Sequence, residues 1–150
     1  MTLEVSDRLA LADLVHTYAA AIDERRFDDA ADLFTETAEL KLADPPQFLE
    51  PIRVHSGRDA IRSALAKVSA VPRTEHAIVG EVYWDDDGRT ARGRVACVAH
   101  HWSRRGEAFT DLVWHARYND TYVRTEAGWR ILMRALTINA IETRPMRRVR

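Results

Sequence analysis

Two histidines on neighbouring predicted strands are the residues of this sequence best placed for acid–base chemistry. In RTEHAIVGEVYW (residues 73–84), side chains alternate between two faces, and His76 falls on the apolar face with Ile78, Val82 and Trp84. In RTARGRVACVAHHW (residues 89–102), the same alternation places His101 on a face of small residues. One buried histidine is usually structural, but two on one face could act as base and acid, because imidazole exchanges its proton near neutral pH.

The face that leads to His101 carries Ala91, Gly93, Val95, Cys97 and Ala99. A sheet face packed tightly against helices would be expected to hold larger side chains. The small residues therefore predict a cavity, in which Val95 and Cys97 are candidate substrate contacts. The alternative is that bulky helix residues fill the space above Gly93 and Ala99.

A histidine base needs a carboxylate to fix its tautomer, and Asp23, near the end of the first predicted helix, is the candidate. Asp23 flanks the apolar stripe of that helix, so the alternative is a solvated charge at the helix end. Asp23, His76 and His101 could also form an iron site of two histidines and one carboxylate, but no local spacing supports it. We predict no metal, and we predict no cofactor because phosphate-binding and dinucleotide motifs do not occur.

The elements that must position these residues change in type along the chain. Helical spacing predicts helices over 6–26, 27–34 and 56–68, the last with Ser56 and Asp59 spaced as a capping box. A strand is predicted over 38–43, and the proline-rich residues 44–51 predict a loop that could form a lid. After Pro72, apolar and polar residues alternate with a period of two, which predicts antiparallel strands. This order predicts an α+β fold, with the helices on one face of a curved sheet.

The length and net charge of the chain limit the classes of function that it can have. The chain has 150 residues and a formal net charge of -1, which suits one domain over 1–150 and gives no basic field for nucleic acid or anionic lipid. We expect residues 143–150 to form a basic C-terminal tail. No apolar run approaches the ~20 residues of a membrane span, and the acidic, polar N-terminus is unlike a secretory signal. We expect a cytoplasmic protein that binds a small molecule, with no nucleic-acid or membrane partner.

Self-association is expected from an apolar-aromatic stripe on a later strand. The stripe consists of Trp114, Ala116, Tyr118 and Tyr122. It would support a homo-oligomer, either a dimer or a trimer, if it lay on the outer face of the sheet. Alternation leaves open whether this face or the opposite face, with Asn119, lines the pocket.

Four segments of the chain resemble one family. The segments YAAAIDERRFDDAADLF, GRDAIRSAL, RTEHAIVG and YNDTYVRTEAGWRILMR are similar to the SnoaL-like branch of the nuclear transport factor 2-like superfamily, from about Leu9 to Thr137. The resemblance implies a cone-shaped α+β barrel, in which three N-terminal helices pack in a curved, mostly antiparallel sheet around a deep pocket. Proteins of this fold include dehydratases, a dehydrochlorinase and isomerases, and also binding modules and dioxygenase subunits without catalytic activity.

The resemblance also implies roles for individual residues. Scytalone dehydratase and the dehydrochlorinase pair a helix Asp with a strand His base, which implies these roles for Asp23 and His76. The second pocket histidine of scytalone dehydratase falls on His101, and a tyrosine of bile acid dehydratase falls on Tyr18. The implied substrate-binding residues are Asn119 and Arg134.

The sequence departs from scytalone dehydratase at two substrate-contacting tyrosines, which here are Ile22 and Leu42. A substrate other than scytalone is therefore expected. Together, the residues and the resemblance predict a cofactor-independent, dehydratase-like lyase that acts on a small cyclic or aromatic molecule. The alternatives are an isomerase or hydrolase using the same dyad, and a non-catalytic ligand-binding module or supporting subunit.

Overall fold

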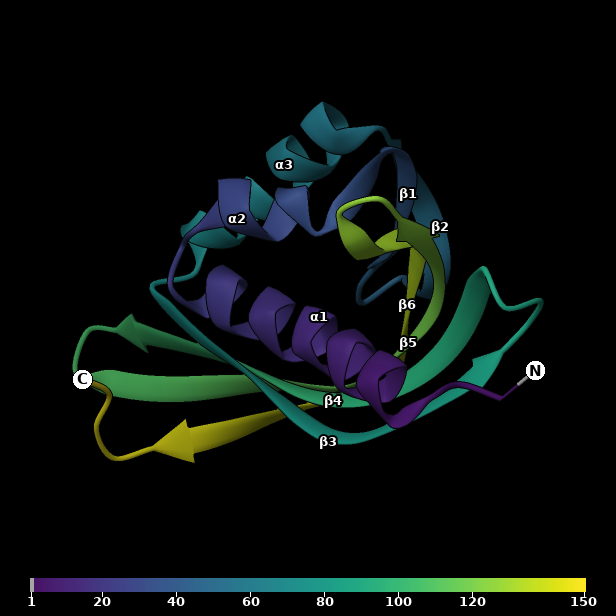
Figure 1. Ribbon diagram of the computed structural model, residues 1–150. Helices are drawn as coiled ribbons and strands as arrows, with labels where there is room; N and C mark the ends of the chain where they lie inside the picture. The colour runs from purple at the N-terminus through teal and green to yellow at the C-terminus, as the bar shows by residue number, and fades with distance from the viewer. Residues whose placement is uncertain (1) are drawn as a thin grey trace.

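The computed structural model describes residues 2–150 and contains three helices on the concave side of a curved sheet (Figure 1). The helices are α1 (Val5–Asp23), α2 (Phe27–Asp32) and α3 (Arg58–Ala66), and a 3-10 turn, η1 (Lys67–Ala70), follows α3. The strands are β1 (Phe34–Asp44), β2 (Phe48–Ser56), β3 (Arg73–Asp85), β4 (Thr90–Arg105), β5 (Ala108–Thr125) and β6 (Gly128–Met146).

The six strands form one sheet in the order β2-β1-β6-β5-β4-β3. Strand β1 pairs with β6 in parallel, and every other neighbouring pair is antiparallel. The α+β fold and the mostly antiparallel curved sheet predicted from the sequence are therefore confirmed. Because β6 continues to Met146, residues 143–146 belong to the sheet rather than to a C-terminal tail.

Helix α1 lies against the inner side of the sheet, where it contacts β3 and β6 (Figure 1). Its apolar side chains recur at helical spacing and are buried, as predicted: Leu11, Leu14, Val15, Tyr18 and Ile22. The helix ends at Asp23, and the chain turns at Arg25, whose φ of 61° is unusual for a residue other than glycine. The turn therefore leaves Asp23 at the edge of the buried region, beside β3.

The small residues of β4 face inward, as alternation predicted, but they are not part of the cavity wall. Close to Gly93, the space is filled by Tyr122 and Tyr83, so that a Cβ atom on Gly93 would lie 2.9 Å from Tyr122 Cε2 and 3.0 Å from Tyr83 Cδ1. The predicted cavity lies nearer the other end of the strand, where His101 is located. The small-residue face is therefore packed core, and only His101 at its end reaches the cavity wall.

Replacement of Gly93 by alanine is expected to destabilise the protein by about 1–3 kcal/mol, because a buried tyrosine ring would have to move. The matched control is Gly80→Ala on β3, where a Cβ atom would meet nothing within 4 Å. Chemical denaturation measures both changes. Equal stability of the two variants would show that the ring of Tyr122 moves at no cost.

The predicted loop over 44–51 is wrong for most of its length. A short turn joins Asp44 to Phe48, and the chain returns as β2 against β1. Pro51 is tolerated because β2 is an edge strand, where a missing N–H breaks no ladder on the open side. The capping box is also wrong, since Ser56 belongs to β2 and α3 follows Gly57 without a side-chain cap.

A register shift in β3 overturns part of the predicted alternation. The pairing with β4 shifts between Ile78 and Gly80, so the face reverses along the strand. Val82 and Trp84 are therefore exposed rather than in the core, and Tyr83 takes the inward position at 6% exposure. His76 precedes the shift and keeps its predicted inward face.

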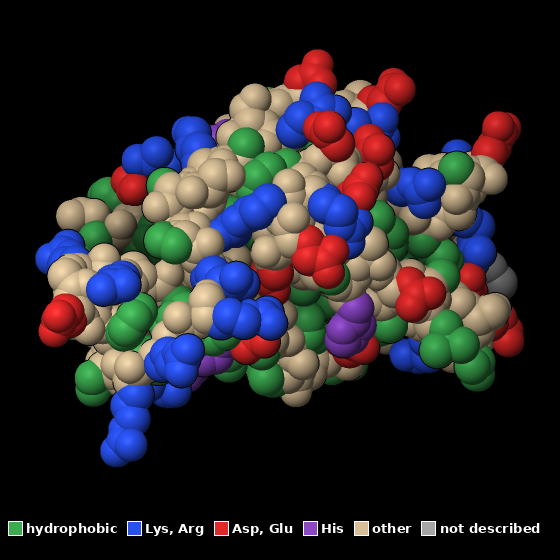
Figure 2. Space-filling model, turned by 90° about the vertical axis from the view of Figure 1, so that its left-hand side faces the viewer, with side chains coloured by type: hydrophobic (Ala, Val, Ile, Leu, Met, Phe, Trp, Pro, Cys, Tyr) green, Lys and Arg blue, Asp and Glu red, His purple; other side chains and the backbone are tan. Residues whose placement is uncertain are grey.

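The aromatic stripe of β5 lies on the inner face of the sheet. Tyr118 and Tyr122 are buried, and Trp114 and Tyr118 line the cavity. The stripe is therefore not available as an outer contact surface. The surface face in Figure 2 mixes Lys and Arg with Asp and Glu, in keeping with the small net charge. Within residues 2–150, none of the helices is long and apolar enough to cross a membrane.

Candidate active site

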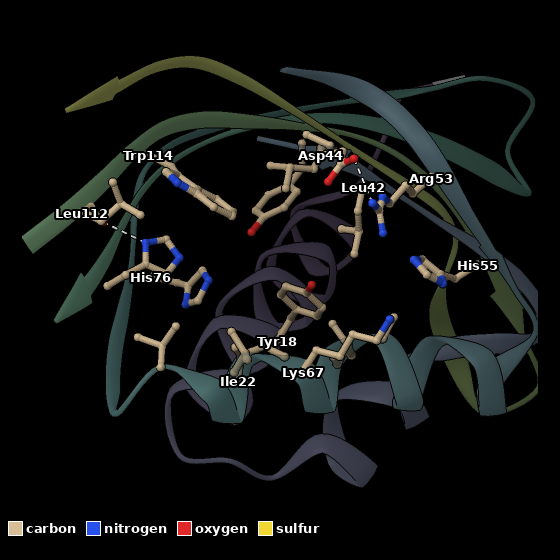
Figure 3. Close-up of a pocket in the computed structure, with 18 residues that line it drawn as sticks. Tyr18, Ile22, Leu42, Asp44, Arg53, His55, Lys67, His76, Leu112 and Trp114 are labelled. Atoms are coloured by element: carbon tan, nitrogen blue, oxygen red, sulfur yellow. Dashed lines mark hydrogen bonds and ion pairs between the residues drawn. The ribbon is translucent and has the colours of Figure 1, made fainter. Parts of the chain in front are cut away.

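A cavity of about 360 Å³ opens between the helices and the inner face of the sheet. His76 lies at one end with Leu112 and Trp114, and Tyr18 lies in the middle (Figure 3). His101 is also part of the wall, next to His76. The wall is mainly apolar, with a few polar groups, as is typical of pockets for small organic molecules.

Asp23 and His76 form a hydrogen-bonded pair at the edge of this cavity. The Nδ1 atom of His76 lies 2.7 Å from Asp23 Oδ1, and the backbone N–H of His76 donates to Asp23 Oδ2 at 2.8 Å. Burial raises the pKa of Asp23, but the hydrogen bonds from the ring and backbone of His76 and from Thr74 outweigh it and leave the pKa lowered. Asp23 is therefore an anion at neutral pH. It favours the tautomer that carries the proton on Nδ1, which leaves the Nε2 lone pair free to accept a proton.

Two residues that the sequence reasoning did not assign hold Asp23 in place. Thr74 donates its hydroxyl hydrogen to Asp23 Oδ1 at 2.9 Å and accepts a hydrogen bond from Arg25 at 3.1 Å. Arg25 also donates to the backbone oxygen of Val71 at 2.6 Å, which ties the end of α1 to the start of β3. Thr74 could have been identified from the sequence, because it lies two residues before His76 and therefore on the same face of the strand.

His101 lies beside His76, with ring centroids 6.4 Å apart, and its exposed fraction is 6%. Its Nδ1 donates to the backbone oxygen of Leu112 at 2.8 Å, and its ring contacts Trp114 at 4.4 Å between centroids. Burial lowers the pKa of His101, against the opposing effect of the Leu112 carbonyl. His101 is therefore neutral at pH 7, and its Nε2 is an acceptor rather than an acid.

The lowered pKa of His101 predicts a loss of stability in mild acid. Since unfolded His101 binds a proton at about pH 6.5 and folded His101 binds it only at lower pH, acid favours the unfolded state. Below pH 6.5, the free energy of unfolding should fall by up to about 1.4 kcal/mol per pH unit from this residue. Burial also lowers the pKa of His55, which therefore contributes to the loss of stability in the same direction.

Thermal melts of the wild type and of His101→Gln between pH 5 and 7.5 measure this effect. The variant should lose less stability on acidification than the wild type. A variant as acid-sensitive as the wild type would contradict the assignment to His101.

A buried charge cluster supports the middle of the cavity. Arg134 is fully buried and binds Asp120 through two hydrogen bonds of 2.9 and 2.6 Å. Its guanidinium carbon lies 4.4 Å from the ring centroid of Tyr18 and 4.2 Å from that of Tyr118. Burial raises the pKa of Tyr18 to about 12, so its phenol stays neutral and can donate a hydrogen bond.

The structure does not bring every predicted substrate contact to the cavity. Arg134 lies behind two cavity-lining tyrosines, and it is not itself part of the wall. Val95 and Cys97 are buried in the core and are not part of the wall, and burial raises the pKa of the Cys97 thiol to about 11. Asn119 is exposed and is not part of the wall. Within residues 2–150, no group of three or more His, Cys, Asp or Glu side chains is arranged to hold a metal ion.

A curved mixed sheet that wraps around three helices, with an Asp–His pair at one end of an apolar cavity, defines an α+β cone with a candidate acid–base site. The chain belongs to the SnoaL-like domain family, whose model matches residues 3–135. The family predicted from the sequence is therefore confirmed. Among relatives, the uncharacterized protein Rv2910c of Mycobacterium tuberculosis is 33% identical over 141 residues, which cover 89% of this chain and 86% of that protein.

Solved structures of different described activities share the fold. A candidate aromatic ring hydroxylase of Novosphingobium aromaticivorans is 24% identical, with a TM-score of 0.79 and 96% of each chain covered. A candidate scytalone dehydratase of the same species is 21% identical, with a TM-score of 0.77 and coverage of 97% of this chain and 91% of that one. The hexachlorocyclohexane dehydrochlorinase LinA type 2 is 16% identical, with a TM-score of 0.76 and coverage of 95% and 90%. At these identities the likeness establishes the fold, and activity must be argued from the site.

Proposed function

We propose that this protein is a cofactor-independent lyase of the dehydratase type, in which His76 is the general base and Asp23 orients it. The observation that carries the proposal is the hydrogen bond between Asp23 and Nδ1 of His76, on a ring that lines the cavity. The half-buried carboxylate fixes the tautomer and stabilises the imidazolium that forms when Nε2 takes a proton. The dehydratase and dehydrochlorinase named among the structural neighbours support elimination as the reaction class.

The proposed step balances without a co-reactant. His76 Nε2 removes a proton from the carbon next to a carbonyl group, and the C–O bond of a hydroxyl on the following carbon breaks as the double bond forms. The His76 imidazolium then returns the proton to the departing oxygen, which leaves as water. Substrate becomes unsaturated product plus water, and the enzyme returns to its starting protonation state.

Two further residues assist this step in the proposal. The neutral hydroxyl of Tyr18 would donate a hydrogen bond to the developing oxyanion of the substrate carbonyl. His101 was expected to act as an acid, but its Nδ1 is already donating and its pKa is lowered. We therefore assign to it the acceptance of a hydrogen bond from the substrate hydroxyl, which would orient the leaving group.

Proton NMR in D₂O tests the reaction class with a panel of model substrates. Cyclic and aryl β-hydroxy ketones are incubated with the protein, and loss of water and exchange at the carbon next to the carbonyl are followed separately. Formation of the unsaturated ketone above the rate of the buffer supports the proposal. Exchange or double-bond migration without water loss would instead favour an isomerase, and saturable binding without either would favour a binding module.

A further inference from the structure

The end of the cavity remote from His76 gathers basic side chains from two elements. Arg53 and His55 come from β2, and Lys67 is the first residue of η1. In Figure 3 these three lie on the side opposite His76, with Tyr18 and Leu42 between the two ends. The cavity therefore has a histidine end, an apolar middle and a basic end.

The basic end carries an unneutralised charge. Arg53 is paired with Asp44, whose Oδ2 lies 2.8 Å from Nη2. Within residues 2–150, the side chain of Lys67 makes neither a hydrogen bond nor an ion pair, and the same is true of the side chain of His55. Two cations and one carboxylate leave a net charge of +1 while His55 is neutral, which suits a ligand with a single negative charge.

The environment of His55 also suits an anion. Burial lowers its pKa, and the nearby positive charges of Lys67 and Arg53 lower it further. A bound anion would reverse the charge effect and would bring a hydrogen-bond acceptor within reach of both His55 and Lys67. A carboxylate has the matching charge and accepts charge-assisted hydrogen bonds.

We propose that the substrate carries a carboxylate at the end remote from its reacting carbon, and that Lys67 and His55 bind it. The inference rests on the proposed function for the statement of which end reacts, but the anion site itself does not require turnover. The substrate class is then a small acidic molecule with an apolar ring or chain between the acid and a β-hydroxy carbonyl group. The charge would fix the direction in which the molecule enters, because the reverse direction would place it against an apolar wall beside His101.

Matched acids and amides test the site. A series of arylalkanoates with increasing chain length, and the primary amide of each, are titrated into the wild type by calorimetry at low ionic strength. At least one acid should bind roughly tenfold more tightly than its amide, and added salt should weaken that preference. Lys67→Met should reduce the preference by roughly fivefold, since a lysine close to solvent gives a moderate ion-pair contribution.

The chain supplies a matched control because it has only two lysines. Lys41→Met removes the other lysine, which is not part of the cavity wall, and should leave the preference unchanged. His55→Gln should reduce the preference as well. An acid that binds no more tightly than its amide, binding of neither across the series, or an equal effect of Lys41→Met and Lys67→Met would overturn the proposal.

Failure of this inference is distinguishable from failure of the proposed function. His76→Ala should keep the preference for the acid over its amide, because Lys67 and His55 lie at the other end of the cavity. Acid binding that depends on Lys67, without any elimination activity, would support the anion site and count against the lyase. Elimination from neutral ketones as efficient as from the corresponding acids would support the lyase and overturn the anion site.

Discussion

His76→Ala is expected to lose at least about a hundredfold in kcat/KM on any substrate identified by its elimination, because a positioned base contributes roughly 10²–10⁴ in rate. Asp23→Asn should lose a comparable factor while the fold persists. An asparagine retains the shape of the side chain but lacks the charge that stabilises the imidazolium, and it can turn an NH₂ group toward Nδ1. Steady-state kinetics from pH 5 to 9 measures both variants.

A second Asp–His pair provides the control. His100 Nδ1 lies 2.6 Å from Asp111 Oδ2, a geometry similar to that of Asp23 and His76, but neither residue lines the cavity. His100→Ala should therefore keep wild-type kcat/KM. If His76→Ala retained full activity, or if His100→Ala lost as much as His76→Ala, the assignment of the base would be wrong.

The largest expected effect on stability comes from the ion pair between Arg134 and Asp120. Both side chains are fully buried, so loss of either leaves the other without a counter-charge in the interior, although Asp120 would keep the hydrogen bond from the hydroxyl of Tyr122. Asp120→Ala and Arg134→Met should each lower the free energy of unfolding by about 3–5 kcal/mol. For a chain of this size, this corresponds to a fall in Tm of roughly 6–20 °C.

The double variant Asp120→Leu/Arg134→Met separates charge from packing. It removes both buried charges, and it should be more stable than Arg134→Met alone because no unpaired carboxylate remains. Asp29→Ala breaks an exposed ion pair of 2.6 Å with Arg26 and should change Tm little. Thermal melts of all the variants in one buffer make the comparison. A double variant less stable than Arg134→Met would show that shape, rather than charge, dominates at this position.

The alternation of side chains between the two faces of a strand predicted the site correctly where the strand is regular. The prediction failed where the backbone is irregular. On β4 it placed His101 on the inner face correctly, because that strand pairs with β5 without a register shift. On β3 it failed beyond Ile78, because strict alternation took no account of Gly80, which lies at the register shift and is the kind of strand glycine that often marks a bulge. On β5 it could not decide between two faces, because the aromatic stripe suits a cavity wall as well as an outer surface.

The contact between Asp23 and His76 was suggested by the family resemblance rather than by the residues alone. The helical periodicity placed Asp23 only on the flank of the apolar stripe. The turn that brings Asp23 to β3 depends on the positive φ of Arg25, which the residue pattern does not predict. The basic end of the cavity was not foreseen at all. Prolines around Phe48 indicated a loop, and the strand that carries Arg53 and His55 was missed.

The parallel pairing of β1 with β6 has a consequence for folding and for detecting a ligand. It joins Leu40 to Arg134, so Leu42 on β1 and Leu136 on β6 line one cavity although they are far apart in sequence. A wall built from such distant segments has high contact order and closes only when nearly the whole chain has folded. Occupancy of the cavity and global folding are therefore thermodynamically linked, and a bound ligand should raise Tm as its concentration exceeds its Kd.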